Sequence, residues 1–233
     1  MSDKARHLQR LQQSIATATA LRGRARADAE TLARRQALRA WQSARLQRSH
    51  AALLADARYG QAARFFVADL YSEKDTGERD AAVARAVPSL SRMLPPSGVE
   101  TVADAIELDA LSESLDDAMV AALGGRASAI DAQSYADAYR VVGRPEDRAR
   151  QIALIENLAA SLDTLTRLPL IGATLKMMRK PAKLLGLGEL QSFLERGYEA
   201  FRAMGRADAF VADVAARERA LMRAWFAGEN PAA

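Results

Sequence analysis

Three carboxylates fall where an amphipathic helix would carry apolar side chains. Residues 97–123 contain seven Asp and Glu residues and no Lys or Arg. At 100° per residue, Asp109, Glu113 and Asp116 lie among apolar positions. The opposite side is consistent with exposure to solvent and carries Glu100, Asp104 and Glu107. The three misplaced carboxylates therefore need partners, because a buried carboxylate without a counter-charge costs several kcal/mol or becomes protonated.

Two kinds of chemistry suit such carboxylates. They can be neutralised by arginines, for which Arg64, Arg79 and the Arg-rich N-terminus are the candidates. Alternatively, Asp69, Asp109 and Glu113 could form a carboxylate-dependent metal site or acid–base pair. Helix-borne di-metal centres normally include Glu-x-x-His pairs, and the chain has only two histidines and no cysteine. We therefore favour ion pairs, a non-enzymatic role and no cofactor or metal. Standard nucleophile, zinc and Walker motifs are absent from the sequence.

A second group of charged and aromatic residues follows Phe65-Phe66. We expect a helix–loop–helix corner in which the two phenylalanines enter the core, an aspartate caps a helix and the remaining charges form ion pairs. The same residues are a candidate binding site: Arg64, Asp69, Tyr71, Asp75, Arg79 and Asp80.

This string resembles an uncharacterised bacterial family of all-helical proteins, a domain of unknown function. Its pattern is Phe-Phe-x-x-Asp-Leu-Tyr-x-x-x-Asp-x-x-x-Arg-Asp, followed by Pro95-Pro96 and an acidic helix. The resemblance extends from about Arg58 to Phe226 and includes residues 151–154 and 197–204. It implies a helical fold and transfers no catalytic residue.

A third group of cations lies in the apolar segment 168–187, which contains no acid. Such a segment can lie on anionic lipid or enclose an acyl chain or an anionic ligand. The alternative is a core helix whose lysines extend to solvent. The cations are Lys176, Arg179, Lys180 and Lys183.

The N-terminal fifty residues carry the excess positive charge. They contain eleven Lys and Arg against three acids, a net charge of +8. The spacing of Leu8, Leu11, Ile15 and Ala18 predicts a helical hairpin or coiled-coil arm that breaks near Gly23 or else protrudes. The arm could pair with the acidic helix in the same chain or across a dimer. Nucleic-acid binding has thin support, because one aromatic residue alone is interleaved among these arginines. The two histidines, both in this region, are predicted to be solvated.

The elements that must position these residues are helices. The chain has 51 Ala but only 20 Gly and Pro residues in 233, and no alternating strand pattern. We predict an all-α multi-helix bundle with an Arg-rich N-terminal helical arm or hairpin, divided into an arm of residues 1–57 and a bundle domain of residues 58–233. Within the bundle we expect helices over 97–123, 131–142 and from 145 to Pro169, then two closing helices.

The resulting functional hypothesis is a structural or adaptor protein that self-associates or binds an acidic protein through a charge-polarised surface. The alternatives are a module for an anionic or lipid-like ligand or membrane surface, and the metal enzyme described above. No apolar run is long enough to span a bilayer, so we expect a cytoplasmic protein. The excess of Arg over Lys, 28 to 5, suggests a GC-rich bacterial genome.

Overall fold

The computed structural model describes residues 2–67, 96–168, 170–184, 186 and 188–231. This part of the chain forms ten α-helices and one short 3₁₀ helix, and it contains no strand. The predicted all-α, multi-helix class is thereby confirmed. None of the described helices has the length and apolar character required to cross a bilayer.

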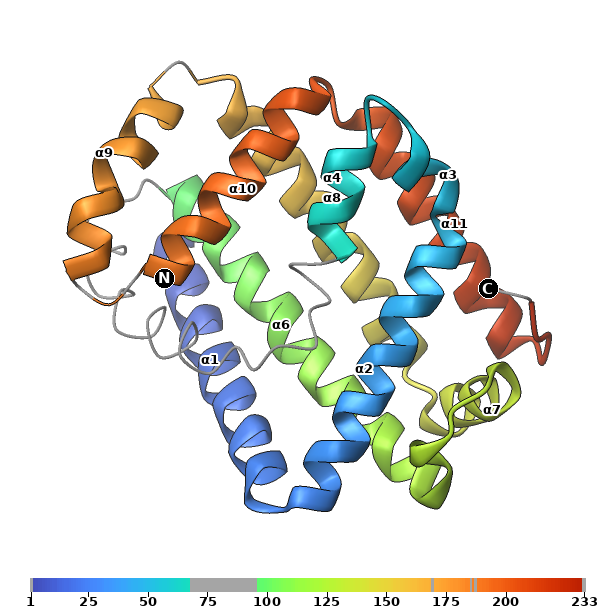
Figure 1. The fold of residues 1–233 in the computed structure, drawn as a ribbon. Coiled ribbons are helices and arrows are strands. Elements are labelled where there is room, and N and C mark those ends of the chain that lie inside the picture. The colour runs from blue at the N-terminus through green and yellow to red at the C-terminus, as the bar shows by residue number, and fades with distance from the viewer. Residues whose placement is uncertain (1, 68–95, 169, 185, 187, 232–233) are drawn as a thin grey trace.

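The N-terminal residues form a helical hairpin of α1 (Asp3–Ala27) and α2 (Ala29–Ser49) (Figure 1). The predicted break near Gly23 is wrong, because Gly23 lies inside α1 and the chain turns at Asp28. Asp28 has an extended backbone, and its carboxylate accepts hydrogen bonds from the amides of Glu30 and Thr31. This side-chain cap satisfies the free amides at the start of α2, which a glycine cannot do.

The acidic helix α6 (Pro96–Leu123) runs between the two arms of this hairpin (Figure 1). It begins at Pro96, one residue before the predicted start, so Ser97 lies inside the helix. The fixed φ of proline suits the first helical turn. The predicted end is confirmed: Leu123 is the last residue, and Gly124 adopts a φ of +54° at the start of the 3₁₀ helix Gly124–Ser128.

The next two helices also match their predicted ranges. In α7 (Ala132–Val142), Asp131 and Ser134 form a capping box, and the helix ends at Gly143 with a φ of +63°. The following helix, α8 (Pro145–Thr166), opens with proline and two acids at its positive end. Its buried apolar residues are Ile152, Leu154 and Ala159, whereas Leu165 near its end is exposed.

Aromatic residues join the first and last parts of the chain. Trp41 of α2 stacks on Tyr135 of α7 with ring centroids 4.0 Å apart, and Trp225 of α11 (Asp208–Phe226) packs on the same tyrosine. A second cluster lies under α3 (Ala51–Ala55) and α4 (Gly60–Phe65), where Phe65 and Phe66 enter the core as expected.

The helix α10 (Gly188–Met204) covers this second cluster and requires a glycine to do so. A Cβ at Gly197 would lie 2.8 Å from the ring of Phe65, so only glycine permits this close approach. The preceding helix, α9 (Ile171–Leu184), lies at the edge of the molecule, where its main neighbour is α10 and its smaller contact is with α8 (Figure 1).

Candidate functional site

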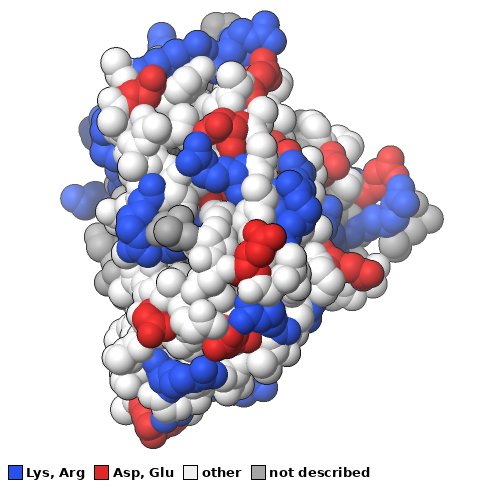
Figure 2. All heavy atoms as spheres, turned by 90° about the vertical axis from the view of Figure 1, so that its right-hand side faces the viewer, with Lys and Arg blue, Asp and Glu red and all other residues white. Residues whose placement is uncertain are grey.

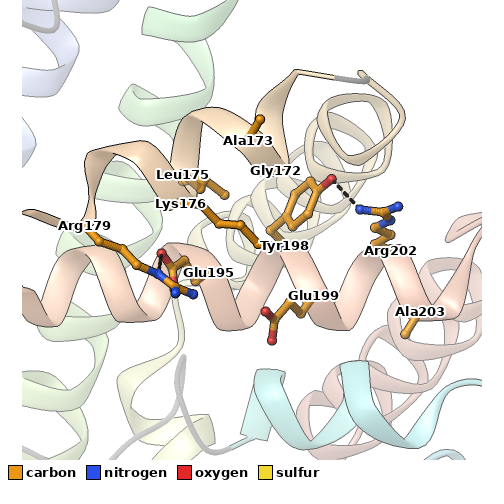
Figure 3. A pocket seen from close by; sticks show the side chains of 10 residues that line it. All are labelled: Gly172, Ala173, Leu175, Lys176, Arg179, Glu195, Tyr198, Glu199, Arg202 and Ala203. Atoms are coloured by element: carbon orange, nitrogen blue, oxygen red, sulfur yellow. Dashed lines mark hydrogen bonds and ion pairs between the residues drawn. The ribbon is translucent and has the colours of Figure 1, made fainter.

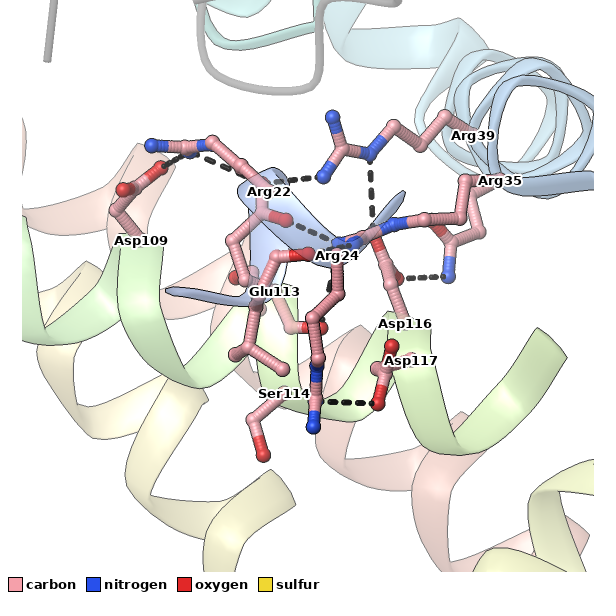
Figure 4. Close-up of polar contacts among 12 residues, drawn as sticks. Arg22, Arg24, Arg35, Arg39, Asp109, Glu113, Ser114, Asp116 and Asp117 are labelled. Atoms are coloured by element: carbon pink, nitrogen blue, oxygen red, sulfur yellow. Dashed lines mark hydrogen bonds and ion pairs between the residues drawn. The ribbon is translucent and has the colours of Figure 1, made fainter. Parts of the chain in front are cut away.

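The most buried carboxylate of α6, Glu113, is surrounded by three arginines of the N-terminal hairpin (Figure 4). Only 2% of Glu113 is exposed. Its Oε1 atom accepts from Arg22 Nε at 3.0 Å and from Arg39 Nη2, and its Oε2 atom accepts from Arg35 Nη2. All three donors come from α1 and α2, so the hairpin neutralises the acidic helix within one chain.

The two neighbouring carboxylates belong to the same network. Asp116 is also buried and accepts from Arg39 Nε and Gln42 Nε2, each at 3.1 Å. Asp109 is a quarter exposed and pairs with Arg22 Nη2 at 2.6 Å. The favoured pairing of these three acids with arginines is therefore observed, and the arginines are those of the N-terminal hairpin.

The predicted solvent-facing side of α6 is wrong at Asp104. That residue is buried and accepts from Arg10 Nη2 at 2.5 Å, and the same guanidinium contacts Glu107 at 3.0 Å. Glu107 also accepts two hydrogen bonds from Arg150 of α8, one from Nε and one from Nη2. Packing of α1 on one side and α8 on another covers this flank of α6, which a helical wheel of α6 alone does not show.

These contacts favour a structural role for the carboxylates. Burial by itself raises the pKa of Glu113, but Arg39, Arg22 and Arg35 together outweigh it and hold the pKa below its ordinary value. Both oxygens of Glu113 are engaged by guanidinium groups, so they are not available as metal ligands. Among the described residues, no three His, Asp or Glu side chains are arranged to hold a metal ion.

The corner after Phe65-Phe66 is only partly described. The exposed Arg64 donates to the carbonyl of Leu54 at 3.2 Å and contacts none of the α6 acids. The predicted residues Asp69, Tyr71, Asp75, Arg79 and Asp80 lie outside the described residues.

The third predicted group, on α9, has a different environment. Arg179 forms a bidentate ion pair with Glu195 of α10, with Nε–Oε1 and Nη2–Oε2 distances of 2.7 Å. The hydrogen bonds from Arg179 and Gln191 lower the pKa of Glu195 to about 2. This pair attaches α9 to α10 and leaves Lys176, Lys180 and Lys183 exposed and without ion pairs to any described residue.

Three large apolar side chains are exposed beside these lysines. Leu170, Met177 and Leu184 are 73%, 75% and 88% exposed. Met177 and Leu184 belong to α9 and are seven residues apart, so they lie on one side of the helix, and Leu170 immediately precedes its first residue. This part of α9 is thus a solvent-facing surface, and only its opposite side, including Leu175 and Ala182, is covered.

A cleft of about 570 Å³ separates α9 from α10 (Figure 3). Its α9 wall includes Gly172 and Lys176, and its α10 wall includes Tyr198 and Arg202. The ring of Tyr198 points towards α9, and its hydroxyl accepts from Arg202 Nη1 at 3.3 Å. A Cβ at Gly172 would lie 2.7 Å from that hydroxyl, so glycine makes room for the tyrosine.

The family Domain of unknown function (DUF8198) matches residues 21–232. The chain belongs to this family. The match confirms the predicted membership of a domain of unknown function and covers part of α1 and every later helix. Searches of curated proteins and of solved structures gave no match.

Two parts of the family fold were not predicted as sites. Tyr198 and Arg202 occur in the string 197–204 that supported the resemblance, but their relation to α9 depends on a helix–helix contact that the sequence does not display. His50 was expected to be solvated and is instead 5% exposed, with Nε2 2.9 Å from Glu218 of α11. Arg45 also donates to Glu218, at 2.6 Å. Burial raises the pKa of Glu218, but Arg45 and His50 outweigh it and lower the pKa overall.

Proposed function

We propose that this protein is a peripheral module that binds anionic membrane surfaces through α9. The observation that carries the proposal is the row of exposed apolar side chains, Leu170, Met177 and Leu184, next to three exposed lysines. Interfacial helices have this composition, with an apolar side that enters the boundary of the acyl chains and basic residues that contact headgroups. The role corresponds to the second hypothesis from the sequence.

The arrangement of the two rows supports a flat, anionic target. At 100° per residue, Ala173 and Pro181 continue the apolar row, while Lys176, Lys180 and Lys183 form a second row along its edge. Segment 168–187 contains no acid that would repel an anionic surface. A membrane with anionic lipids can bind both rows, because its negative headgroups can pair with the lysines and its acyl chains can contact the apolar side chains.

The expected affinity has two sources of comparable size. A lysine near an anionic leaflet contributes about 1 kcal/mol, and full burial of a Leu or Met side chain contributes about 1.5–3 kcal/mol. Three residues of each kind give a binding free energy that vesicle assays detect, even after the cost of immobilisation.

The face formed around α2, α7 and α11 offers a contrast. Figure 2 shows positive and negative side chains interspersed over this face, without a continuous patch of one sign. The arginines of the N-terminal region suggested an acidic protein partner or self-association, and at least five of the ten, including Arg35, the most buried of them, pair with acids of α6. The structural or adaptor hypothesis therefore has less support here than binding through α9.

The test is co-sedimentation with vesicles of phosphatidylcholine alone and with phosphatidylglycerol added. We expect binding to the mixed vesicles, decreasing with salt, and little binding to the neutral ones. The variant K176Q/K180Q/K183Q should reduce binding by about 100-fold, at about 1 kcal/mol per lysine.

A matched control removes the same charge elsewhere. The variant R206Q/R217Q/R223Q changes three exposed arginines outside α9 and should bind as the wild type does. Equal binding to neutral and anionic vesicles, or equal losses in the two triple variants, would contradict the proposal. An acidic protein captured by α9 with no vesicle binding would replace it with the adaptor hypothesis.

A further inference from the structure

The cleft between α9 and α10 contains two cations that form no ion pair with a described carboxylate. Its charged residues are Lys176 and Arg179 on α9 and Glu195, Glu199 and Arg202 on α10. Arg179 and Glu195 form an ion pair with each other at one end of the cleft. Lys176 and Arg202 have no ion pair with any described residue, and Arg202 donates to the hydroxyl of Tyr198 and lies over its ring.

The remaining acid of the cleft does not face these cations. Glu199 is exposed, and in Figure 3 its side chain points away from the ring of Tyr198. The same view places Tyr198 between Lys176 and Arg202. Lys176, Tyr198 and Arg202 all line this cleft, and each can donate hydrogen bonds to an anion.

We propose that this part of the cleft binds a phosphate monoester. The inference rests on the proposed function, for which it names the preferred headgroup. A phosphate monoester carries about −1.5 to −2 charges at neutral pH, which matches two cations, and its three oxygens accept from Arg, Lys and Tyr. A phosphodiester, with one negative charge, matches this site less well.

The position of Lys176 connects the cleft to the membrane-binding surface. Lys176 lines the cleft and also belongs to the row of lysines beside the exposed apolar residues. A lipid whose phosphate enters the cleft can thus keep its acyl chains in the bilayer beneath α9. The same chemistry also admits a soluble phosphate ester, so the two sources have to be separated by experiment.

Gly172 sets the width of the site. Because a Cβ at this position would lie 2.7 Å from the Tyr198 hydroxyl, Gly172→Ala must displace the hydroxyl without removing any charge. This variant tests the geometry of the cleft, whereas Arg202→Gln tests its charge. Arg202 is exposed, so its replacement leaves the core intact.

The first experiment compares vesicles of equal surface charge that contain phosphatidic acid or phosphatidylglycerol. We expect tighter binding to phosphatidic acid, and a loss of about tenfold or more in Arg202→Gln, the size expected for one charged hydrogen bond. Gly172→Ala should lose the same preference. Binding to phosphatidylglycerol should change little in both variants, and Arg223→Gln, an exposed control on α11, should behave as the wild type does.

A second experiment separates the two sources and the two proposals. Amide chemical shifts of residues 172–203 are followed during titration with inorganic phosphate and with dihexanoyl phosphatidic acid. Saturable shifts that disappear in Arg202→Gln support the site, and shifts with phosphate but no vesicle binding assign it to a soluble ester. If the protein binds anionic vesicles without preferring phosphatidic acid, or if Arg202→Gln has no effect, the proposal of a phosphate site in the cleft is wrong but membrane binding stands. If the protein binds no vesicles, the proposed membrane-binding function is wrong.

Discussion

The carboxylate network of α6 and the lysines of α9 use charge in opposite ways. Glu113 and Asp116 are buried, and each is contacted by arginine from the N-terminal hairpin. The α9 lysines are exposed, next to apolar side chains that are also exposed. The first region uses charge to attach helices to one another, and the second leaves both charge and apolar surface for a partner.

The difference shows how a function can be separated from a structural role. A buried carboxylate whose oxygens already accept hydrogen bonds from arginines has little capacity left for a ligand. Unpaired cations at the surface cost little in water and gain free energy when an anion arrives. Composition alone points to both regions, and the packing around each one distinguishes them.

The largest expected effect comes from breaking the buried network. Glu113→Gln removes the charge shared by Arg22, Arg35 and Arg39 and leaves buried cations without compensation. We expect the free energy of unfolding to fall by about 3–5 kcal/mol, measured by urea denaturation. Asp117→Asn is the matched control, because Asp117 is 39% exposed and its pair with Arg24 is worth about 0–1 kcal/mol. Similar losses of unfolding free energy in the two variants would show that burial does not increase the contribution of the network to stability.

A smaller effect is expected from acid. The pKa of Glu113 in the folded protein lies below its ordinary value of 4.5, so the folded state favours the carboxylate. The resulting stability is present above pH 4.5 and is lost as the pH falls through the lower, folded-state pKa. Urea midpoints measured from pH 6 to pH 3 should therefore decrease, and the decrease should be shallower in Glu113→Gln. Parallel curves for the two proteins would contradict this assignment.

The smallest effect on stability is expected on α9. Met177→Ser and Leu184→Ser replace side chains that are 75% and 88% exposed, and each should change the free energy of unfolding by about 0.5 kcal/mol or less. Leu115→Ala, at a position with no exposure, should cost about 2–5 kcal/mol. A large loss in the α9 variants would mean that this surface is already covered within the protein.

The helices were predictable where local chemistry determines them. The capping residue Asp131, the glycines 124 and 143, and Pro145 all mark helix ends in the structure. The position of the hairpin turn was not predictable. Glycine and aspartate both interrupt helices, and the sequence does not show which of them the tertiary contacts select.

The type of partner for the α6 acids was predictable, but its identity was not. A helical wheel shows that Glu113 faces apolar positions and needs a cation, while the choice among 28 arginines depends on which helices pack on α6. Asp104 was assigned to solvent for the same reason, since α1 covers it. The exposed apolar row of α9 likewise depends on tertiary packing, because no helix among the described residues covers it and a local pattern does not show this.

The separation along the chain between Glu113 and its arginines has a consequence for synthesis. Arg35 precedes Glu113 by 78 residues, so at 5–20 residues per second the ribosome makes the acid roughly 4–16 s after the arginine. During that interval residues 1–50 carry a net charge of +8, and the seven acids of residues 97–123 then offset most of it. The N-terminal hairpin is thus made well before the acids that pair with it, and its buried ion pairs can form only after residue 113 has been synthesised.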